Sequence, residues 1–163
     1  MQARAPIRMT FEEYIAFEAT AERKHEFING EVFAMAGGTL EHALLAANVI
    51  RELGILLSGT PCVVFTSDAR IKVKATGLTT YPDVTVICGP IERDPLDANT
   101  ATNPIALVEV LSDSTEAYDR GEKFAHYRRI PSLRAYLLVS QKEARIEVFR
   151  RNDEGSWTLD EAR

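Results

Sequence analysis

The sequence contains few cysteines and no long hydrophobic run. Cys62 and Cys88 are the only two cysteines among 163 residues, which excludes a framework of several disulfides and a zinc site built from cysteines alone. No run reaches the roughly eighteen apolar residues of a transmembrane helix. The N-terminal residues MQARAPIRMTFEEY lack the apolar core of a secretory signal. We therefore expect a cytoplasmic protein with no membrane association.

The sequence also lacks the excess of positive charge that is typical of proteins binding nucleic acid nonspecifically. It has 24 acidic and 19 basic residues, a net charge of −5. Residues 117–134 nevertheless carry five basic residues against two acidic ones, and such a segment can bind a phosphate backbone locally. No GxxxxGKS loop is present, so no nucleotide cofactor is expected. Charge alone neither favours nor excludes a nucleic-acid partner.

Composition and pattern predict one globular domain over residues 1–163, with 45% hydrophobic and 26% charged residues. Thr10 is suited to cap a helix reaching about Ala21, and Asn29-Gly30 predicts a hairpin turn. A long helix is expected over residues 39–58, with an apolar face formed by leucines 40, 44, 53, 56 and 57.

The second half of the chain reads as strands around one further helix. Residues 89–104 hold three prolines and predict a surface loop, and a helix is expected from Ser114 or Thr115 to Arg129. The resulting fold class is α/β or α+β, a mixed β-sheet flanked by helices. The predicted strands are residues 62–67, 69–75, 81–88, 105–112, 133–140 and 144–151.

Two acidic residues, Asp83 and Glu109, interrupt runs that otherwise have the composition of buried strands. A buried carboxylate must be neutralised, paired or bound to metal. If the two strands are neighbours, both side chains can point into one cleft, where oxygen ligands suit Mg²⁺ or Mn²⁺. The alternatives are a turn-capping role for Asp83 and a buried salt bridge from Glu109 to Arg134 or Arg145.

Asp119, Lys123 and Tyr127 are spaced to form one stripe of the helix that follows Glu109. The stripe is either a solvent-exposed face of the helix, or it places Lys123 in the cleft beside the two acidic residues. A lysine in the cleft can orient or help deprotonate a water molecule, and can stabilise charge on a phosphate. A single histidine on a helix, such as His42, is more often a packing residue than a functional one. His25 and His126 are interpreted as structural.

Four motifs together carry a family resemblance. They are HEFINGE at 25–31, YPDVTV at 81–86, LVEVLSDST at 107–115 and YDRGEKFAHYRR at 118–129, with His42 between the first two. In this order and spacing the sequence resembles the Uma2 family of endonucleases, formerly a domain of unknown function, within the PD-(D/E)xK superfamily. The resemblance extends from about residue 9 to residue 151, and it implies a restriction-endonuclease-like fold.

The resemblance implies Mg²⁺- or Mn²⁺-dependent hydrolysis of DNA, with Asp83, Glu109 and Lys123 as catalytic residues. Asp83 and Glu109 would bind the metal, together with the backbone carbonyl of Val110 and with Glu26, which is otherwise a surface residue of the hairpin. The superfamily places its lysine two residues after the second acid, where this sequence has Leu111. Lys123 matches the position from which the Uma2 pattern supplies a basic residue instead.

The expected function is therefore that of a metal-dependent endonuclease that hydrolyses DNA, acting as a homodimer because duplex cleavage requires two active sites. The main alternative is an inactive nuclease fold that binds nucleic acid or protein. A metal-dependent enzyme with a substrate other than nucleic acid is a third possibility. The resemblance also implies a further C-terminal piece beyond SWTLDEAR.

Overall fold

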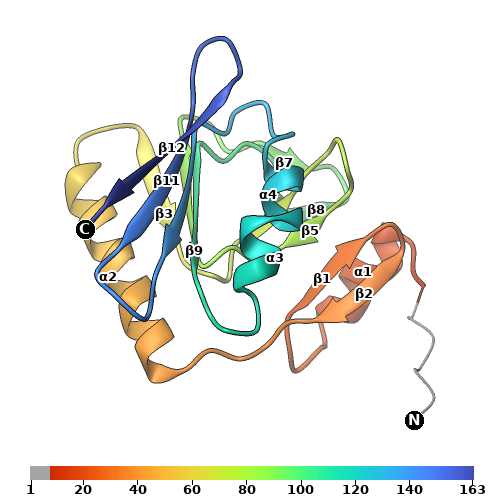
Figure 1. The fold of residues 1–163 in the computed structure, drawn as a ribbon. Coiled ribbons are helices and arrows are strands. Elements are labelled where there is room, and N and C mark those ends of the chain that lie inside the picture. Colours follow the sequence, from red (N-terminus) through yellow and green to blue (C-terminus); the bar gives the residue numbers. More distant parts are fainter. Residues whose placement is uncertain (1–7) are drawn as a thin grey trace.

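A computed structural model describes residues 8–163, which form two mixed β-sheets and four helices (Figure 1). The α+β class agrees with the sequence prediction, but the strands divide between two six-stranded sheets and do not form one. The predicted domain over residues 1–163 includes residues 1–7, which lie outside the described residues. Within the described chain, no helix is both long enough and apolar enough to cross a bilayer.

The first sheet contains the predicted N-terminal hairpin at one edge, in the strand order β2-β1-β5-β4-β8-β7. Asn29 and Gly30 both adopt positive φ angles, 51° and 83°, as a type I′ hairpin turn requires. Only β4 and β8 pair in parallel. The strands are β1 (His25–Ile28), β2 (Glu31–Ala34), β4 (Arg70–Lys72), β5 (Thr79–Thr80), β7 (Arg93–Asp94) and β8 (Asp97–Ala101).

The prediction of a surface loop at residues 89–104 is wrong, because this segment contributes β7 and β8 to the first sheet. A tertiary ion pair explains why a polar segment forms strands there. The buried guanidinium of Arg70 contacts the Asp97 carboxylate at 3.0 Å and donates a hydrogen bond to Thr100. Strand propensity depends on such neighbours, which local sequence does not reveal.

The second sheet has the strand order β12-β11-β10-β9-β6-β3, with β9 and β10 as its parallel pair. The sequence predicted five of its strands and missed β12. Most residues of β12 are exposed, so its sequence lacks the alternation of apolar and polar residues that marks a half-buried strand. The strands are β3 (Cys62–Phe65), β6 (Val84–Cys88), β9 (Ala106–Val110), β10 (Ala135–Val139), β11 (Ile146–Arg151) and β12 (Trp157–Ala162).

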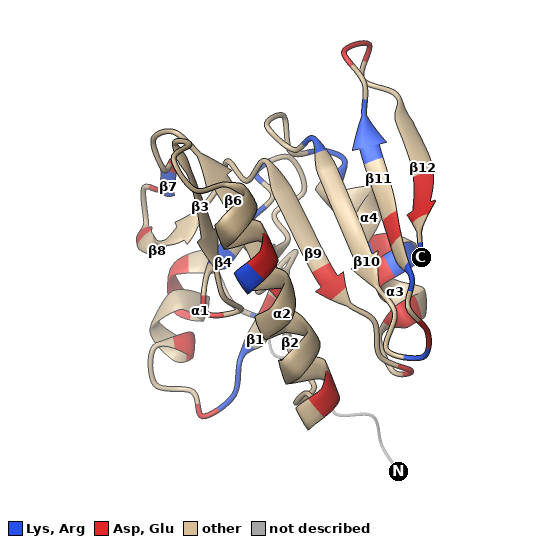
Figure 2. Cartoon of the chain, turned by 90° about the vertical axis from the view of Figure 1, so that its left-hand side faces the viewer, with Lys and Arg blue, Asp and Glu red and all other residues tan. Residues whose placement is uncertain are grey.

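Helices cover the second sheet on both faces, with α2 on one side and α3 and α4 on the other (Figures 1 and 2). Helix α1 (Phe11–Glu18) begins at Thr10, which forms a capping box with Glu13, and ends before the predicted Ala21. The predicted single helix to Arg129 is instead two short helices, because the backbone breaks at Gly121. They are α3 (Glu116–Arg120) and α4 (Glu122–Tyr127).

Helix α2 (Leu40–Leu56) packs on the second sheet through a face different from the predicted one. Leu40, Leu44 and Leu56 are 85%, 62% and 75% exposed. The residues that pack against Val84, Val108, Val110 and Val139 are Leu45, Ala46, Val49, Ile50 and Leu53. Because apolar residues occur around much of this helix, its sequence did not identify the face that meets the sheet.

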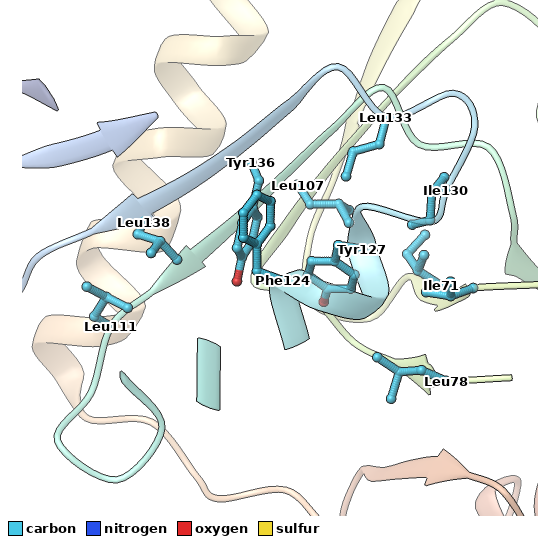
Figure 3. Close-up of a cluster of buried hydrophobic side chains, with 11 residues drawn as sticks. Ile71, Leu78, Leu107, Leu111, Phe124, Tyr127, Ile130, Leu133, Tyr136 and Leu138 are labelled. Atoms are coloured by element: carbon cyan, nitrogen blue, oxygen red, sulfur yellow. The ribbon is translucent and has the colours of Figure 1, made fainter. Parts of the chain in front are cut away.

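The main core lies between the second sheet, helix α4 and residues on and next to β4 of the first sheet (Figure 3). Phe124 and Tyr127 of α4 pack against Tyr136 of β10, whose ring stacks on Phe124 with centroids 5.3 Å apart. Leu107 and Leu111 from β9 and the segment after it belong to the same cluster. This packing fixes α4 over β9, the strand that carries Glu109.

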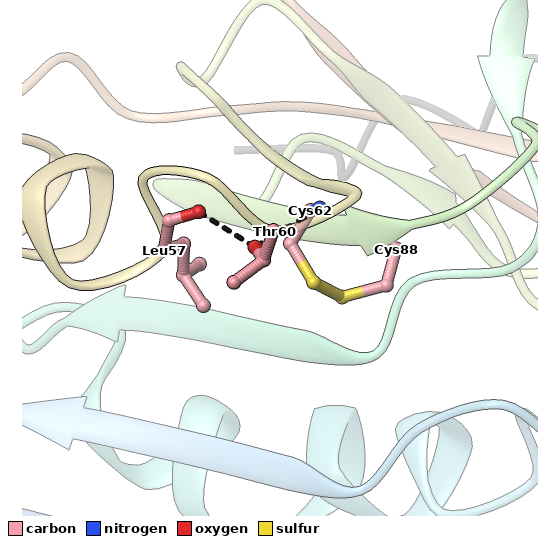
Figure 4. The surroundings of a disulfide bond; sticks show 4 residues. All are labelled: Leu57, Thr60, Cys62 and Cys88. Carbon is pink, nitrogen blue, oxygen red and sulfur yellow. Dashed lines mark hydrogen bonds between the residues drawn. A yellow bond between two sulfur atoms is a disulfide. The ribbon is translucent and has the colours of Figure 1, made fainter.

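Cys62 and Cys88 form a disulfide between β3 and β6 (Figure 4). The two residues are direct partners in the antiparallel register of these strands. Sequence reasoning considered the cysteines only for a disulfide framework and a zinc site, and it missed this pair. Their proximity depends on strand pairing across a separation of 26 residues, which local sequence does not encode.

We predict that Cys62→Ala/Cys88→Ala lowers the free energy of unfolding by about 2–4 kcal/mol, because the disulfide restricts the unfolded chain. Denaturant unfolding of oxidised wild type, reduced wild type and the double variant measures this effect. Reduced wild type should match the variant. Equal stability of the oxidised and reduced wild type would contradict the prediction.

Candidate active site

Asp83 immediately precedes β6 and Glu109 lies on the neighbouring strand β9, so the two residues can face one cleft as predicted. β6 and β9 are antiparallel, with Val84 opposite Val108. Asp83 precedes Val84 and Glu109 follows Val108, so the two acidic residues occupy opposed positions at the same end of the pair. Asp83 Oδ2 accepts a hydrogen bond of 2.7 Å from the backbone N–H of Val110. This bond holds the Asp83 carboxylate beside the end of β9.

Glu109 is buried, and its partners come from α4. Its Oε1 atom accepts hydrogen bonds from Lys123 Nζ at 3.3 Å and from the Tyr127 hydroxyl at 2.9 Å. Arg145, one of the two arginines considered as a partner, instead contacts Glu143. Both bonds to Glu109 use the same oxygen, so Oε2 remains available for a further contact.

Lys123 joins three carboxylates. Its Nζ atom lies 2.7 Å from Asp119 Oδ1, 3.3 Å from Glu109 Oε1 and 3.7 Å from Glu26 Oε1. The lysine side chain is only 5% exposed, so the stripe on this helix is not a solvated face. Asp119 and Lys123 remain adjacent even though Gly121 breaks the helix between them.

Glu26 is turned into the site and is not a surface residue of the hairpin. Its two oxygens accept hydrogen bonds from different hydroxyl groups: Oε1 from Thr80 at 2.6 Å and Oε2 from Tyr118 at 3.1 Å. Its side chain is 12% exposed. Pairing of β1 with β5 brings the hairpin to Thr80. Sequence reasoning missed Tyr118, although a tyrosine next to Asp119 on the same helix was a usable signal.

His42 lies in the site, against the expectation that it packs elsewhere. Its Nε2 atom is 3.1 Å from Asp83 Oδ2. A Cβ atom at Gly38 would lie 2.9 Å from His42 Nδ1, so the absence of a side chain at Gly38 makes room for the imidazole. His25, interpreted as structural, contacts Glu18 at 2.9 Å through its Nδ1 atom.

Leu111, at the position of the superfamily's lysine, belongs to the main core and is 4% exposed. It packs in the same cluster as Phe124 and Tyr127. A lysine there would have to bury its ammonium group among apolar side chains, which is costly. The positive charge of the site therefore comes from α4 and not from the strand.

The site holds more negative than positive charge. Burial, reinforced by Asp83 and Asp119, outweighs the attraction of Lys123 and raises the pKa of Glu109 to about 8. Burial alone would lower the pKa of Lys123, but Glu109, Asp119 and Glu26 together hold it above its usual range. One shared ammonium thus does not neutralise the surrounding carboxylates, and the equilibrium of Glu109 is shifted toward its protonated form.

The site residues line one cavity of about 750 Å³. Asp83, Glu109, Val110 and Lys123 all border it, as does Glu26. Its other walls are residues 34–39 between β2 and α2, residues 111–116 after β9, and residues 140–143 after β10. The structure thus brings together every residue that the sequence singled out for catalysis or metal binding.

The donor set fits a Mg²⁺ or Mn²⁺ ion bound through a small number of protein oxygens. Mg²⁺ usually takes one or two carboxylates and keeps several waters, and Asp83 and Glu109 supply two carboxylates. Within the described residues, no three His, Cys, Asp or Glu side chains are close enough to form a metal site by themselves. Glu26 already binds Thr80, Tyr118 and Lys123, which makes it the least available of the expected ligands.

We predict that Glu109→Gln does not destabilise the metal-free protein at pH 8. The folded-state pKa of Glu109 lies above its value in the unfolded chain, so its contribution to stability is lost as pH rises through about 8. Melting temperatures from pH 5 to pH 9 should fall less steeply for the variant than for wild type. If Glu109 served in a structural ion pair, the variant would lose about 3–5 kcal/mol.

Comparisons with known proteins agree with the expected family. Residues 11–163 match Uma2, described as "Putative restriction endonuclease". Uncharacterized protein slr1290 of Synechocystis sp. is 39% identical over 152 residues, covering 93% of this chain and 79% of that protein. Uncharacterized protein sll1609 of Synechocystis sp. is 35% identical over 153 residues, covering 94% and 86%.

A solved structure has a similar fold. The crystal structure of a "putative nuclease belonging to DUF820" from Anabaena variabilis superposes with a TM-score of 0.72. The alignment covers 93% of this chain and 84% of that one at 15% sequence identity, a level at which the likeness concerns the fold alone. The family match over nearly the whole chain goes further, and the protein belongs to the Uma2 family.

Proposed function

We propose that this protein is a Mg²⁺- or Mn²⁺-dependent endonuclease that hydrolyses phosphodiester bonds of DNA. The observation that carries the proposal is the convergence of Asp83, Glu109 and Lys123 on one cavity. These three residues come from the start of β6, from β9 and from α4, and their side chains are the types that phosphodiester hydrolysis requires. Family membership supports the nuclease class, and the site supports its metal dependence.

The shortage of positive charge supports a metal-binding role for the carboxylates. Two glutamates and one aspartate share one lysine, and the raised pKa of Glu109 favours a proton on its carboxyl group. A divalent cation would displace that proton and satisfy the free oxygens of Asp83 and Glu109. When bound, the cation would polarise the scissile phosphate and lower the pKa of the attacking water.

The protein's own groups have distinct roles in the proposed hydrolysis. Asp83 is held by the Val110 N–H and His42, and Glu109 by Lys123 and Tyr127, so both carboxylates are pre-oriented. A water molecule gives up a proton as its oxygen forms the new bond to phosphorus, and the leaving oxygen takes up a proton as its bond to phosphorus breaks. Lys123 contributes positive charge next to the phosphate as negative charge develops.

The alternative of an inactive binding module is less well supported. Such a module would not need to keep buried carboxylates, which cost stability unless they are compensated. Here Asp83 and Glu109 are both present and line the cavity. Hydrolysis of a substrate other than nucleic acid uses the same residue types, and family membership favours the nuclease.

We also propose a homodimer, and the exposed face of α2 supports it. Leu40, Leu44, Ile55 and Leu56 are at least 62% exposed and lie along one helix. Burying such side chains against a second copy would be favourable. Two-fold symmetry is the commonest arrangement for such an assembly.

Asp83→Ala should abolish or strongly weaken Mn²⁺ binding, because it removes one of the two carboxylates with a free oxygen. Calorimetric titration of Mn²⁺ into wild type and the variant measures the affinity directly. Asp153→Ala, in the exposed β11–β12 turn, is the matched control and should bind like wild type. Equal affinity in wild type and Asp83→Ala would remove Asp83 from the metal site.

Lys123→Met should reduce the single-turnover cleavage rate at saturating DNA by roughly 10²–10³-fold, as removal of other positioned charges does. Lowering the salt concentration should not restore the rate, because the loss concerns the transition state and not DNA affinity. Lys74→Met is the control, since Lys74 is exposed and outside the cavity. Circular dichroism checks that the variant is folded. A folded variant that cleaves at the wild-type rate would exclude Lys123 from catalysis.

A further inference from the structure

We infer that the cavity accepts a phosphodiester bond from an unpaired DNA strand and excludes the interior of an intact duplex. The inference rests on the proposed nuclease function and concerns the form in which its substrate reaches the site. Three properties of the cavity carry it: the depth of the reactive groups, the enclosure of the site by three segments, and the charge of its rim.

The reactive groups lie deep. The side chains of Glu109 and Lys123 are each 5% exposed, and that of Asp83 is 15% exposed. They are therefore reached only through the cavity and are not presented on an open surface. A scissile phosphate must enter the cavity to meet them.

The cavity is too small to hold a stretch of base-paired helix. Its volume is about 750 Å³. Segments 34–39, 111–116 and 140–143 border it. In Figure 1 the connection from β2 to α2 passes beneath the end of β9 and the loop that follows it. This volume is in the range of sites for small ligands, and a single nucleotide unit fits such a space.

Apart from Lys123, the basic residues among the described lining of the cavity are Lys142 and Arg145, and each contacts a carboxylate. Lys142 Nζ lies 2.7 Å from Asp113, and Arg145 Nε lies 3.2 Å from Glu143. Proteins that hold duplex DNA neutralise several phosphates with lysine and arginine. The rim is therefore poorly suited to the dense charge of a duplex.

Neutral polar groups at the rim suit a single strand instead. Ser112, Ser114, Thr115, Ser140 and Gln141 border the cavity. Hydroxyl and amide groups form hydrogen bonds with the phosphate and sugar of a nucleotide without demanding a high charge density. An unpaired strand also enters without the unstacking and unpairing that a buried base pair requires.

The test compares three internally labelled DNAs of one sequence with Mn²⁺ present: a single strand, a fully paired duplex, and a duplex with a central unpaired segment of about ten nucleotides. We expect the single strand to be cleaved about 100-fold faster than the paired duplex, because the duplex must first open. Cuts in the third DNA should fall within its unpaired segment. Cleavage of the paired duplex at a rate similar to that of the single strand would overturn the inference.

A binding measurement separates this inference from the nuclease function. Fluorescence anisotropy with Glu109→Gln and Ca²⁺ compares the affinities for single-stranded and duplex DNA. Ser114→Trp narrows the rim, and Ser156→Trp makes the same exchange in the exposed β11–β12 turn. We expect Ser114→Trp to lose single-strand binding by about tenfold or more and Ser156→Trp to retain it.

The outcomes of the two experiments are distinguishable. If no DNA is cleaved but the single strand binds more tightly than the duplex and Ser114→Trp weakens that binding, the nuclease proposal fails and the preference of the cavity stands. Equal or tighter binding of the duplex, or equal binding by both tryptophan variants, would overturn the inference even if the protein cleaves DNA.

Discussion

The structure of the site depends on one shared cation. The Lys123 ammonium lies within 4 Å of Glu26, Asp119 and Glu109, which come from the hairpin, from α3 and from the second sheet. Without it, three carboxylates would be buried with no counter-charge, which is strongly unfavourable. The lysine therefore connects three separate parts of the fold and sets the electrostatics of the cavity at the same time.

Contacts from several parts of the fold position the Lys123 ammonium. Phe124 and Tyr127 anchor α4 in the main core. Lys123 directly precedes Phe124 on this helix and is therefore directed at β9. The break at Gly121 lets the chain change direction, while a bond of 2.7 Å still joins Asp119 to Lys123. Hydrogen bonds from Thr80 and Tyr118 to Glu26 bring the hairpin to the same point. Apolar packing positions the helices, and polar contacts fix the geometry at their junction.

Moving the basic residue from the strand to a helix has a packing advantage. Leu111 fills this part of the core with an apolar side chain, where a lysine would place a polar one. Lys123 reaches Glu109 from the layer that covers the sheet, so the ammonium approaches the carboxylate without crossing the core. The same arrangement leaves Glu109 Oε2 and the carboxylate of Asp83 facing the cavity, next to the segments that enclose it.

The sequence by itself determined the α+β class, the hairpin, most strands of the second sheet and the two strand acids of the site, Asp83 and Glu109. These features have local signals: a positive-φ turn at Asn29-Gly30, alternation within strands, and acidic residues in otherwise apolar runs. The order and spacing of the motifs around Asp83, Glu109 and Lys123 are also features of the sequence alone, and they indicated the family.

Only the tertiary structure decided the features that depend on distant partners. The division into two sheets, the strands at residues 93–101, the face by which α2 packs and the pairing of Cys62 with Cys88 are of this kind. The contact of His42 with Asp83 and the shared environment of Lys123 belong with them. Local sequence limits which side chains can be buried, but their partners and pKa values follow from long-range packing, because burial and neighbouring charges exist only once the chain has folded.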